Sequence, residues 1–301
     1  MSVGLRTGRA RARQLAVRFL PPSAKRGILE AKDVLVDGLV RLRVRRGHLG
    51  PLPHFVIIGG QKCGTTYLYD RLLEHPLVYR CLVKEPHFFH YNYSKGEDWY
   101  RAHFYSRLLE QTPGAITGEA SGSIFYPHAP SRVSEIVPDA KLIALLRNPV
   151  DRAHSHYFHE VRLGFESLSF EHALEQEERR LEGETAKVLA DENYYSFNRH
   201  HFSYVAKGIY HEQLERWLTH FPREQLLVIK SEDFYADTSR ILREVRAFLG
   251  LPAWTPSPYR GHKAFAYPPM RASTRRSLAE RLRPHNERLY ELLGKNLGWD
   301  S

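Results

Sequence analysis

The chain has 301 residues, of which 42% are hydrophobic and 26% are charged, values typical of a folded globular protein and not of a disordered one. Its formal net charge is +10, because 44 Lys and Arg residues stand against 34 Asp and Glu residues. This excess suits an anionic partner, such as nucleic acid, an anionic glycan, an anionic membrane or a highly charged nucleotide, and it does not choose among them.

Cysteine usage and hydropathy favour a cytoplasmic protein. The two cysteines, Cys63 and Cys81, provide neither a disulfide framework nor the ligand spacing of a zinc site. No window approaches the roughly 18 continuous apolar residues of a membrane span, and charge and proline interrupt the apolar pieces near the N-terminus. We therefore expect a cytoplasmic location.

Residues 1–50 are expected to form a basic N-terminal extension, partly helical or disordered, before a single domain at residues 51–301. Apolar residues between positions 28 and 40 recur at a spacing that fits an amphipathic helix. We favour a solvated, partly disordered extension, and an arm that contacts an anionic membrane or polymer is the alternative. The arginines of this extension form two clusters: Arg6, Arg9, Arg11, Arg13 and Arg18, then Arg41, Arg43, Arg45 and Arg46.

The stretch from Phe55 to Leu73 predicts a strand, a phosphate loop and a helix. An apolar run of strand length ends at a glycine pair, and after a short polar turn apolar residues recur at helical spacing. The unpaired N–H groups and the dipole of a helix start favour a bound anion. Glycines let the backbone approach a phosphate, and threonine hydroxyls add donors. These residues are Gly59, Gly60, Gly64, Thr65 and Thr66.

This loop nearly matches the nucleoside triphosphate motif of glycine, four residues, glycine, lysine, then serine or threonine. Gly59 and Gly64 have the required spacing, but Thr65 stands where the lysine belongs, and the lysine lies inside the loop as Lys62. The displacement disfavours a kinase or NTPase and points to another phosphate-bearing substrate. A glycine-rich turn without a ligand is the alternative.

The segment from Lys84 to His90 contains a candidate general base. Glu85 stands beside a lysine that could control its charge and two aromatic residues that could exclude water. The alternative is an ordinary surface pair of Lys84 and Glu85 next to core aromatics.

A second anion site is expected after the apolar strand at residues 141–146. Arg147 ends this strand, Pro149 suits a first helical turn, and Ser155 follows on the helix. An arginine and a serine so placed can hold a phosphate through charge-assisted hydrogen bonds. An arginine paired with a carboxylate is the alternative, but two strand-to-helix turns with anion chemistry favour the phosphate.

The rest of the chain alternates strands with helices, which predicts an α/β sheet with ligands at the carboxyl ends of its strands. Residues 193–201 are rich in aromatics and histidines and form a candidate acceptor-binding loop. Strands are expected at 78–80, 116–121 and 226–230. Helices are expected at 96–111, 131–137, 166–184, 210–221, 238–249 and, interrupted at Pro284, 275–297.

Three ordered motifs resemble those of sulfotransferases that use 3′-phosphoadenosine 5′-phosphosulfate (PAPS), in particular the heparan sulfate (N-/3-O-) sulfotransferase branch and its bacterial relatives. Three shorter segments also resemble that branch: Gly208-Ile209-Tyr210, the Phe221-Pro222 that follows it, and Tyr267-Pro268-Pro269-Met270. The three motifs are Gly59-Gly60-Gln61-Lys62-Cys63-Gly64-Thr65-Thr66, Lys84-Glu85-Pro86-His87-Phe88-Phe89, and Leu146-Arg147-Asn148-Pro149-Val150-Asp151-Arg152-Ala153 with Ser155.

The resemblance implies an αβα sandwich with a central, mostly parallel sheet, similar to the fold of P-loop NTPases. It also implies that Lys62 contacts the 5′-phosphosulfate and stabilises the leaving phosphate, while Glu85 deprotonates the acceptor. Arg147 and Ser155 would hold the 3′-phosphate. The implied nucleotide-binding residues are Gln61, Lys62, Cys63, Gly64, Thr65, Thr66, Arg147, Ser155, Tyr210 and Lys263.

The expected reaction is transfer of the sulfuryl group of PAPS to a hydroxyl or amine, with release of PAP. A sulfuryl group carries less charge than a phosphoryl group, so lysine and backbone donors can act without a metal ion. The acceptor could be a glycan, a glycolipid or a small hydroxyl compound, and no specific nucleic acid is expected. A nucleotide-dependent kinase and a non-catalytic basic binder of glycan or nucleic acid are the alternatives. Candidate acceptor-binding residues are Lys84, His87, Tyr194, Tyr195 and His200.

Overall fold

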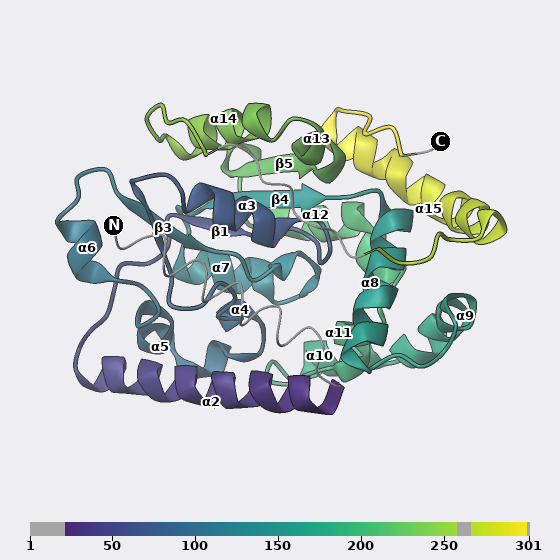
Figure 1. The fold of residues 1–301 in the computed structure, drawn as a ribbon, viewed down its shortest axis with the longest axis horizontal. Coiled ribbons are helices and arrows are strands. Elements are labelled where there is room, and N and C mark those ends of the chain that lie inside the picture. The colour runs from purple at the N-terminus through teal and green to yellow at the C-terminus, as the bar shows by residue number, and fades with distance from the viewer. Residues whose placement is uncertain (1–21, 258–265, 300–301) are drawn as a thin grey trace.

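The computed structural model describes residues 22–257 and 266–299 (Figure 1). Five parallel strands form one sheet with the order β2-β3-β1-β4-β5. Helices pack against this sheet, which confirms the expected αβα arrangement with a parallel sheet. The strands are β1 (Phe55–Ile57), β2 (Val78–Arg80), β3 (Ile116–Glu119), β4 (Lys141–Leu146) and β5 (Leu226–Lys230).

The central strand β1 positions the site. Phe55 is opposite Gly118 of β3 on one side and Lys141 of β4 on the other. Because all strands run the same way, the loop after β1 and Arg147 after β4 lie at the same edge of the sheet. In the sheet, β3 lies on one side of β1 and β4 lies on the other, so the strand order reverses at β1. Open α/β sheets bind ligands at such a switch point.

Many helices surround this sheet, and two buried apolar clusters hold them. The larger cluster packs around the sheet, and the smaller one joins α8, α9 and α15 through side chains such as Tyr157, Phe170 and Leu282. The helices are α2 (Pro22–Arg45), α3 (Thr65–Leu72), α4 (Phe88–Tyr91), α5 (Glu97–Arg101), α6 (Ser106–Glu110), α7 (Ala129–Ile136), α8 (Pro149–Leu163), α9 (Phe170–Leu181), α10 (Glu184–Ala190), α11 (Phe197–Phe202), α12 (Tyr210–Leu218), α13 (Ser231–Ala236), α14 (Thr238–Leu249) and α15 (Ala272–Leu293). Short 3-10 turns are η1 (Tyr93–Lys95), η2 (Ser123–Phe125), η3 (Ala206–Gly208) and η4 (Arg223–Gln225).

The single helix expected at 96–111 is wrong, because the chain breaks between α5 and α6. The carbonyls at the break accept hydrogen bonds from distant parts of the chain and not from a continuing helix. Arg43 donates to the carbonyls of Ala102 and Phe104, both at 2.6 Å, and the N–H of Leu82 donates to that of His103 at 2.7 Å. These tertiary contacts outweigh the local helical pattern.

Two other helix predictions need correction. The interruption expected at Pro284 is wrong, because α15 runs through this proline and ends at Leu293, with Gly294 as its C-cap at a φ of 62°. The helix expected from residue 166 begins only at Phe170. Glu166 accepts from the N–H groups of the next two residues, and Ser169 caps the helix by accepting from His172.

Helix α2 lies within the expected basic extension and packs on the domain. Val40 is fully buried, and Arg43 binds the break between α5 and α6. Asp37 accepts from Lys95 at 3.1 Å and from the indole N–H of Trp99 at 3.2 Å. Residues 1–21 of the extension lie outside the described residues. Among the described helices, none is long and apolar enough to cross a membrane.

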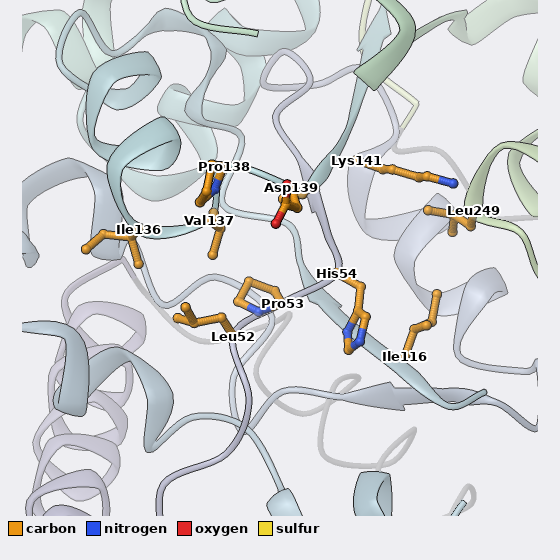
Figure 2. Close-up of a pocket in the computed structure, with 11 residues that line it drawn as sticks. Leu52, Pro53, His54, Ile116, Ile136, Val137, Pro138, Asp139, Lys141 and Leu249 are labelled. Carbon is orange, nitrogen blue, oxygen red and sulfur yellow. The ribbon is translucent and has the colours of Figure 1, made fainter. Parts of the chain in front are cut away.

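A cavity of about 340 Å³ opens at the edge of the sheet where β1, β3 and β4 begin (Figure 2). Leu52, His54, Ile116, Val137 and Lys141 are among the residues that line it. It contains none of the residues predicted to bind the nucleotide or the acceptor. It also lies at the edge opposite to the carboxyl ends of the strands, where parallel sheets bind ligands.

Candidate active site

The loop between β1 and α3 has the shape of an anion cradle. Gly59 fits against β4, since a Cβ there would lie 2.5 Å from the backbone nitrogen of Leu145. Gly64 has a φ of 92°, and a Cβ there would lie 2.6 Å from the hydroxyl of Tyr235. Helix α3 begins at the next residue, Thr65, so its first N–H groups are available to an anion. Thr65 is half-buried and Thr66 is exposed at this helix start.

Lys62 sits in this loop with a φ of 70°, an unusual backbone conformation for a residue with a side chain. Burial, together with the charges of Arg162 and Arg147, lowers the pKa of Lys62 to about 8. The guanidinium of Arg147 donates to the carbonyl of Lys62 at 3.4 Å. Three cationic side chains therefore gather around the loop, and a polyanion would relieve their mutual repulsion.

Helix α8 forms the wall next to this loop. Asn148 caps its start by accepting from the N–H of Val150 at 3.0 Å. Ser155, His159 and Arg162 share one helix face, because they are spaced by four and three residues. His159 interacts electrostatically with Lys62, which places this face toward the loop. The structure therefore brings Ser155, 7% exposed, to the wall of the candidate nucleotide site.

Tyr267 joins Arg147 to α8, a role that the sequence analysis missed. Burial alone would lower the pKa of Arg147, but hydrogen bonding and electrostatic attraction to Tyr267 raise it. The ring of Tyr267 stacks on Phe158 at 4.9 Å and meets His154 at 5.2 Å. Its only sequence signal was the Tyr-Pro-Pro-Met segment. The predicted Lys263 lies outside the described residues.

Buried groups fix the turn after β1 and the turn after β4 relative to each other. Tyr210 is 1% exposed, donates to the carbonyl of Arg147 at 2.9 Å and lies 3.8 Å from the sulfur of Cys63. The Ser231 hydroxyl donates to the carbonyls of Cys63, at 2.7 Å, and Leu146, at 2.9 Å. Tyr210 therefore contacts both turns from the interior of the protein. Burial raises the pKa of the Cys63 thiol to about 11, so this thiol is neutral near pH 7.

Glu85, the residue predicted to act as the base, follows Lys84, whose carbonyl accepts from the N–H of Ala120 just after β3 at 3.0 Å. Its carboxylate is 41% exposed, forms an ion pair with Lys84 and lies 3.8 Å from Nε2 of His87. His87 has a φ of 51°, and its N–H donates to the hydroxyl of Ser121 at 3.1 Å. Burial and the charge of Lys84 lower the pKa of His87 to about 4, so this imidazole is neutral near pH 7.

Most predicted acceptor-binding residues lie near one another, but Tyr194 does not join them. His87 and His200 interact electrostatically, and the ring of Tyr195 lies 5.5 Å from that of His200. Tyr195 also meets Tyr91 edge-on at 5.4 Å. Tyr194 instead donates to Glu184 of α10 at 3.1 Å. The predicted acceptor-binding residues that lie together therefore come from the segments around α4 and α11.

Two buried residues near the site had been overlooked. Lys207 donates to the side chain of Gln61 and to the carbonyl of His200, and burial lowers its pKa to about 7. Glu119 ends β3, is fully buried and accepts from Ser121 at 2.5 Å, and burial raises its pKa to about 7. In the sequence, the position of Glu119 at the end of a predicted strand could have identified it as a candidate site residue. No sequence pattern identifies Lys207.

One group of three candidate metal ligands occurs among the described residues. It consists of His211, Glu212 and His285, where α12 meets α15. The imidazoles of His211 and His285 lie 3.1 Å apart, within hydrogen-bond distance. This group includes none of the residues predicted to take part in the reaction.

Comparisons with known proteins agree with this geometry. The sulfotransferase domain model matches residues 52–287. Heparan sulfate glucosamine 3-O-sulfotransferase 3A1 of Mus musculus is 34% identical over 279 residues, which cover 83% of this chain and 65% of the relative. Bifunctional heparan sulfate N-deacetylase/N-sulfotransferase 4 of Mus musculus is 33% identical over 276 residues, covering 80% of this chain and 30% of the relative.

A solved structure extends the agreement to three dimensions. The crystal structure of a sulfotransferase from Alicyclobacillus acidocaldarius superposes with a TM-score of 0.67 and 33% identity, covering 83% of this chain and 100% of that chain. The chain spans about two thirds or less of the length of the two mouse relatives. The match over residues 52–287 shows that the chain belongs to the sulfotransferase domain family.

Proposed function

We propose that this protein transfers the sulfuryl group of PAPS to a hydroxyl or amine of a glycan and releases PAP. The observation that carries the proposal is the pairing of two anion-binding turns at one edge of the sheet. The turn after β1 holds Lys62, the turn after β4 holds Arg147, and a hydrogen bond joins them. PAPS is a fitting ligand because it carries anionic groups at both its 5′ and 3′ positions.

The chemistry of the two turns matches the two ends of PAPS. The N–H groups from Gly64 to Thr66 and the ammonium of Lys62 suit the 5′-phosphosulfate. Arg147 and Ser155 suit the 3′-phosphate, and Tyr267 holds Arg147 beside α8. In this proposal Gln61, Cys63 and Tyr210 shape the turns, and Lys263 is a further candidate contact.

The proposed reaction is an in-line displacement at sulfur. The carboxylate of Glu85 takes the proton of the acceptor hydroxyl or amine as the acceptor atom bonds to sulfur. The bond between sulfur and the bridging oxygen breaks, and its electron pair goes to the 5′-phosphate of PAP. The ammonium of Lys62 stabilises the charge that develops on that oxygen. Lysine and backbone donors suffice for this charge, so the proposal needs no metal ion.

A glycan is the acceptor class that the site supports best. The names of the two mouse relatives specify heparan sulfate. The acceptor side of this chain presents Lys84, His87, Tyr195 and His200, a mixture of cationic, aromatic and hydrogen-bonding groups that suits an anionic sugar. A glycolipid or a small hydroxyl compound remains an alternative within the same reaction. A cytoplasmic location is also proposed, and the two buried, unpaired cysteines support it.

Thermal unfolding with nucleotides tests the proposal against the other functions. In a buffer with EDTA, PAP should raise the melting temperature strongly and ATP should not, because ligands stabilise the state they bind. A kinase would instead need Mg²⁺ and prefer ATP, and a basic binder would respond to neither. Transfer from labelled PAPS to heparan-type oligosaccharides would then test the acceptor class.

A further inference from the structure

The outward face of α2 carries a continuous apolar stripe. Its side chains are far more exposed than large hydrophobic residues usually are: Val34 at 72%, Leu35 at 75%, Leu39 at 44% and Leu42 at 42%. The helical spacing of these residues places them on one side of the helix. An exposed apolar stripe on a surface helix, with no partner among the described residues, marks an interaction site.

The other side of α2 holds the helix to the domain, so the stripe has a fixed direction. Val40 is fully buried, and Arg43 donates to two backbone carbonyls. Asp37 bonds Lys95 and Trp99, and α2 contacts both α5 and α8. Figure 1 shows α2 along one border of the molecule, with no described helix or strand beyond it. The stripe therefore faces away from the protein.

Positive charges predominate in this part of the sequence, since residues 22–46 contain seven Lys and Arg residues and three Asp and Glu residues. Arg41 is 70% exposed, and Arg45 and Arg46 are exposed at the end of the helix. Asp37, the one carboxylate with a described side chain on α2, is engaged with Arg41 and with the domain. The 21 residues that precede α2 in the sequence contain five arginines and no Asp or Glu. The partner should therefore be both apolar and anionic.

We propose that α2 docks on an anionic membrane surface. The helix lies parallel to the membrane, the stripe enters the boundary between headgroups and acyl chains, and the arginines contact lipid phosphates. Nucleic acid would neutralise the arginines but would leave the leucines exposed. A second copy of the chain would cover the leucines but would bring two arginine clusters together.

Vesicle co-sedimentation tests this surface with the full chain. The wild type should bind vesicles of phosphatidylcholine with phosphatidylserine at least 10-fold more tightly than vesicles of phosphatidylcholine alone, and added salt should weaken the binding. The variant Leu35→Ser/Leu39→Ser should lose at least 10-fold in affinity, while Leu35→Met/Leu39→Met should keep it. Thermal unfolding should be unchanged in both, since these side chains are exposed.

A charge variant supplies the second arm of the test. Arg45→Ala/Arg46→Ala should weaken binding to the anionic vesicles, whereas Arg240→Ala/Arg243→Ala on α14 should not. Equal binding by the serine variant and the wild type would overturn the proposal. A dimer in light scattering that the serine substitutions abolish would identify a second copy as the partner and would overturn it too. The assay uses no PAPS, so its result is independent of the proposed reaction.

Discussion

The ammonium of Lys207 lies 2.8 Å from the side-chain oxygen of Gln61 and 2.6 Å from the carbonyl oxygen of His200. One buried amino group thus joins the loop after β1 to α11, which carries His200. Lys207 is 9% exposed, and its burial lowers its pKa to about 7. The proposed nucleotide-binding loop and the proposed acceptor-binding helix are therefore joined by the hydrogen bonds of a single side chain.

Lys207→Met should release this connection without leaving a large cavity, since methionine has a similar length. We expect kcat/KM for PAPS to fall about 10-fold, the effect of losing a hydrogen bond from a charged group. The double variant with Gln61→Ala should lose little more than either single variant, because both remove the same contact. Steady-state kinetics measure this, with Lys187→Met on α10 as the control. Fully additive losses would contradict the connection.

Glu85→Gln should abolish most turnover and leave the nucleotide affinity unchanged. The amide cannot accept the acceptor's proton, and loss of a general base typically costs about 10²-fold to 10⁴-fold in rate. Initial rates with labelled PAPS and calorimetric titration with PAP measure the two effects separately. Glu110→Gln on α6 provides the control. Near-normal turnover by Glu85→Gln would exclude this carboxylate as the base.

Arg147→Ala should weaken PAP binding about 10-fold to 100-fold, because a hydrogen bond to a charged group contributes about 1.5–3 kcal/mol. Its affinity for AMP, which has no 3′-phosphate, should change little. Ser155→Ala should show the same selectivity with a smaller loss. Calorimetric titration of each variant with both nucleotides makes the test. An equal loss for PAP and AMP would contradict a 3′-phosphate site at Arg147.

PAP affinity should depend on pH through Lys62. Because the pKa of Lys62 is lowered to about 8 in the free protein, the ammonium is present at pH 7 and is lost as the pH rises above 8. A bound phosphate favours the charged form, so the affinity should fall by up to about 10-fold per pH unit between pH 8 and 10. In Lys62→Ala the binding should be weak and flat over this range. A slope retained by that variant would place the titration on another group.

The local motifs were predictable from the sequence because each depends on neighbours along the chain. The glycines and threonines after β1 indicate a strand, a cradle and a helix, and Pro149 after Arg147 indicates the next helix start. The structure has both turns where the sequence predicted them.

Contacts between distant segments were not predictable in this way. The break between α5 and α6 depends on Arg43, which lies about 60 residues earlier in the chain. Lys207 meets Gln61 across 146 residues, and nothing in the pattern around either residue signals the pair. Tyr194 and Tyr195 are adjacent in sequence, yet Tyr194 bonds Glu184 of α10 and Tyr195 bonds His201 of α11.

The hydroxyl of Ser231, which bonds the carbonyls of Cys63 and Leu146, sets the separation of the two turns before a nucleotide arrives. A ligand therefore does not have to spend binding energy on bringing the turns together. We therefore expect the proposed site to select nucleotides by the distance between their two phosphate groups. A 2′-phosphate isomer of PAP has the same charge as PAP but a different span between its phosphates, so we expect the proposed site to bind it more weakly than PAP.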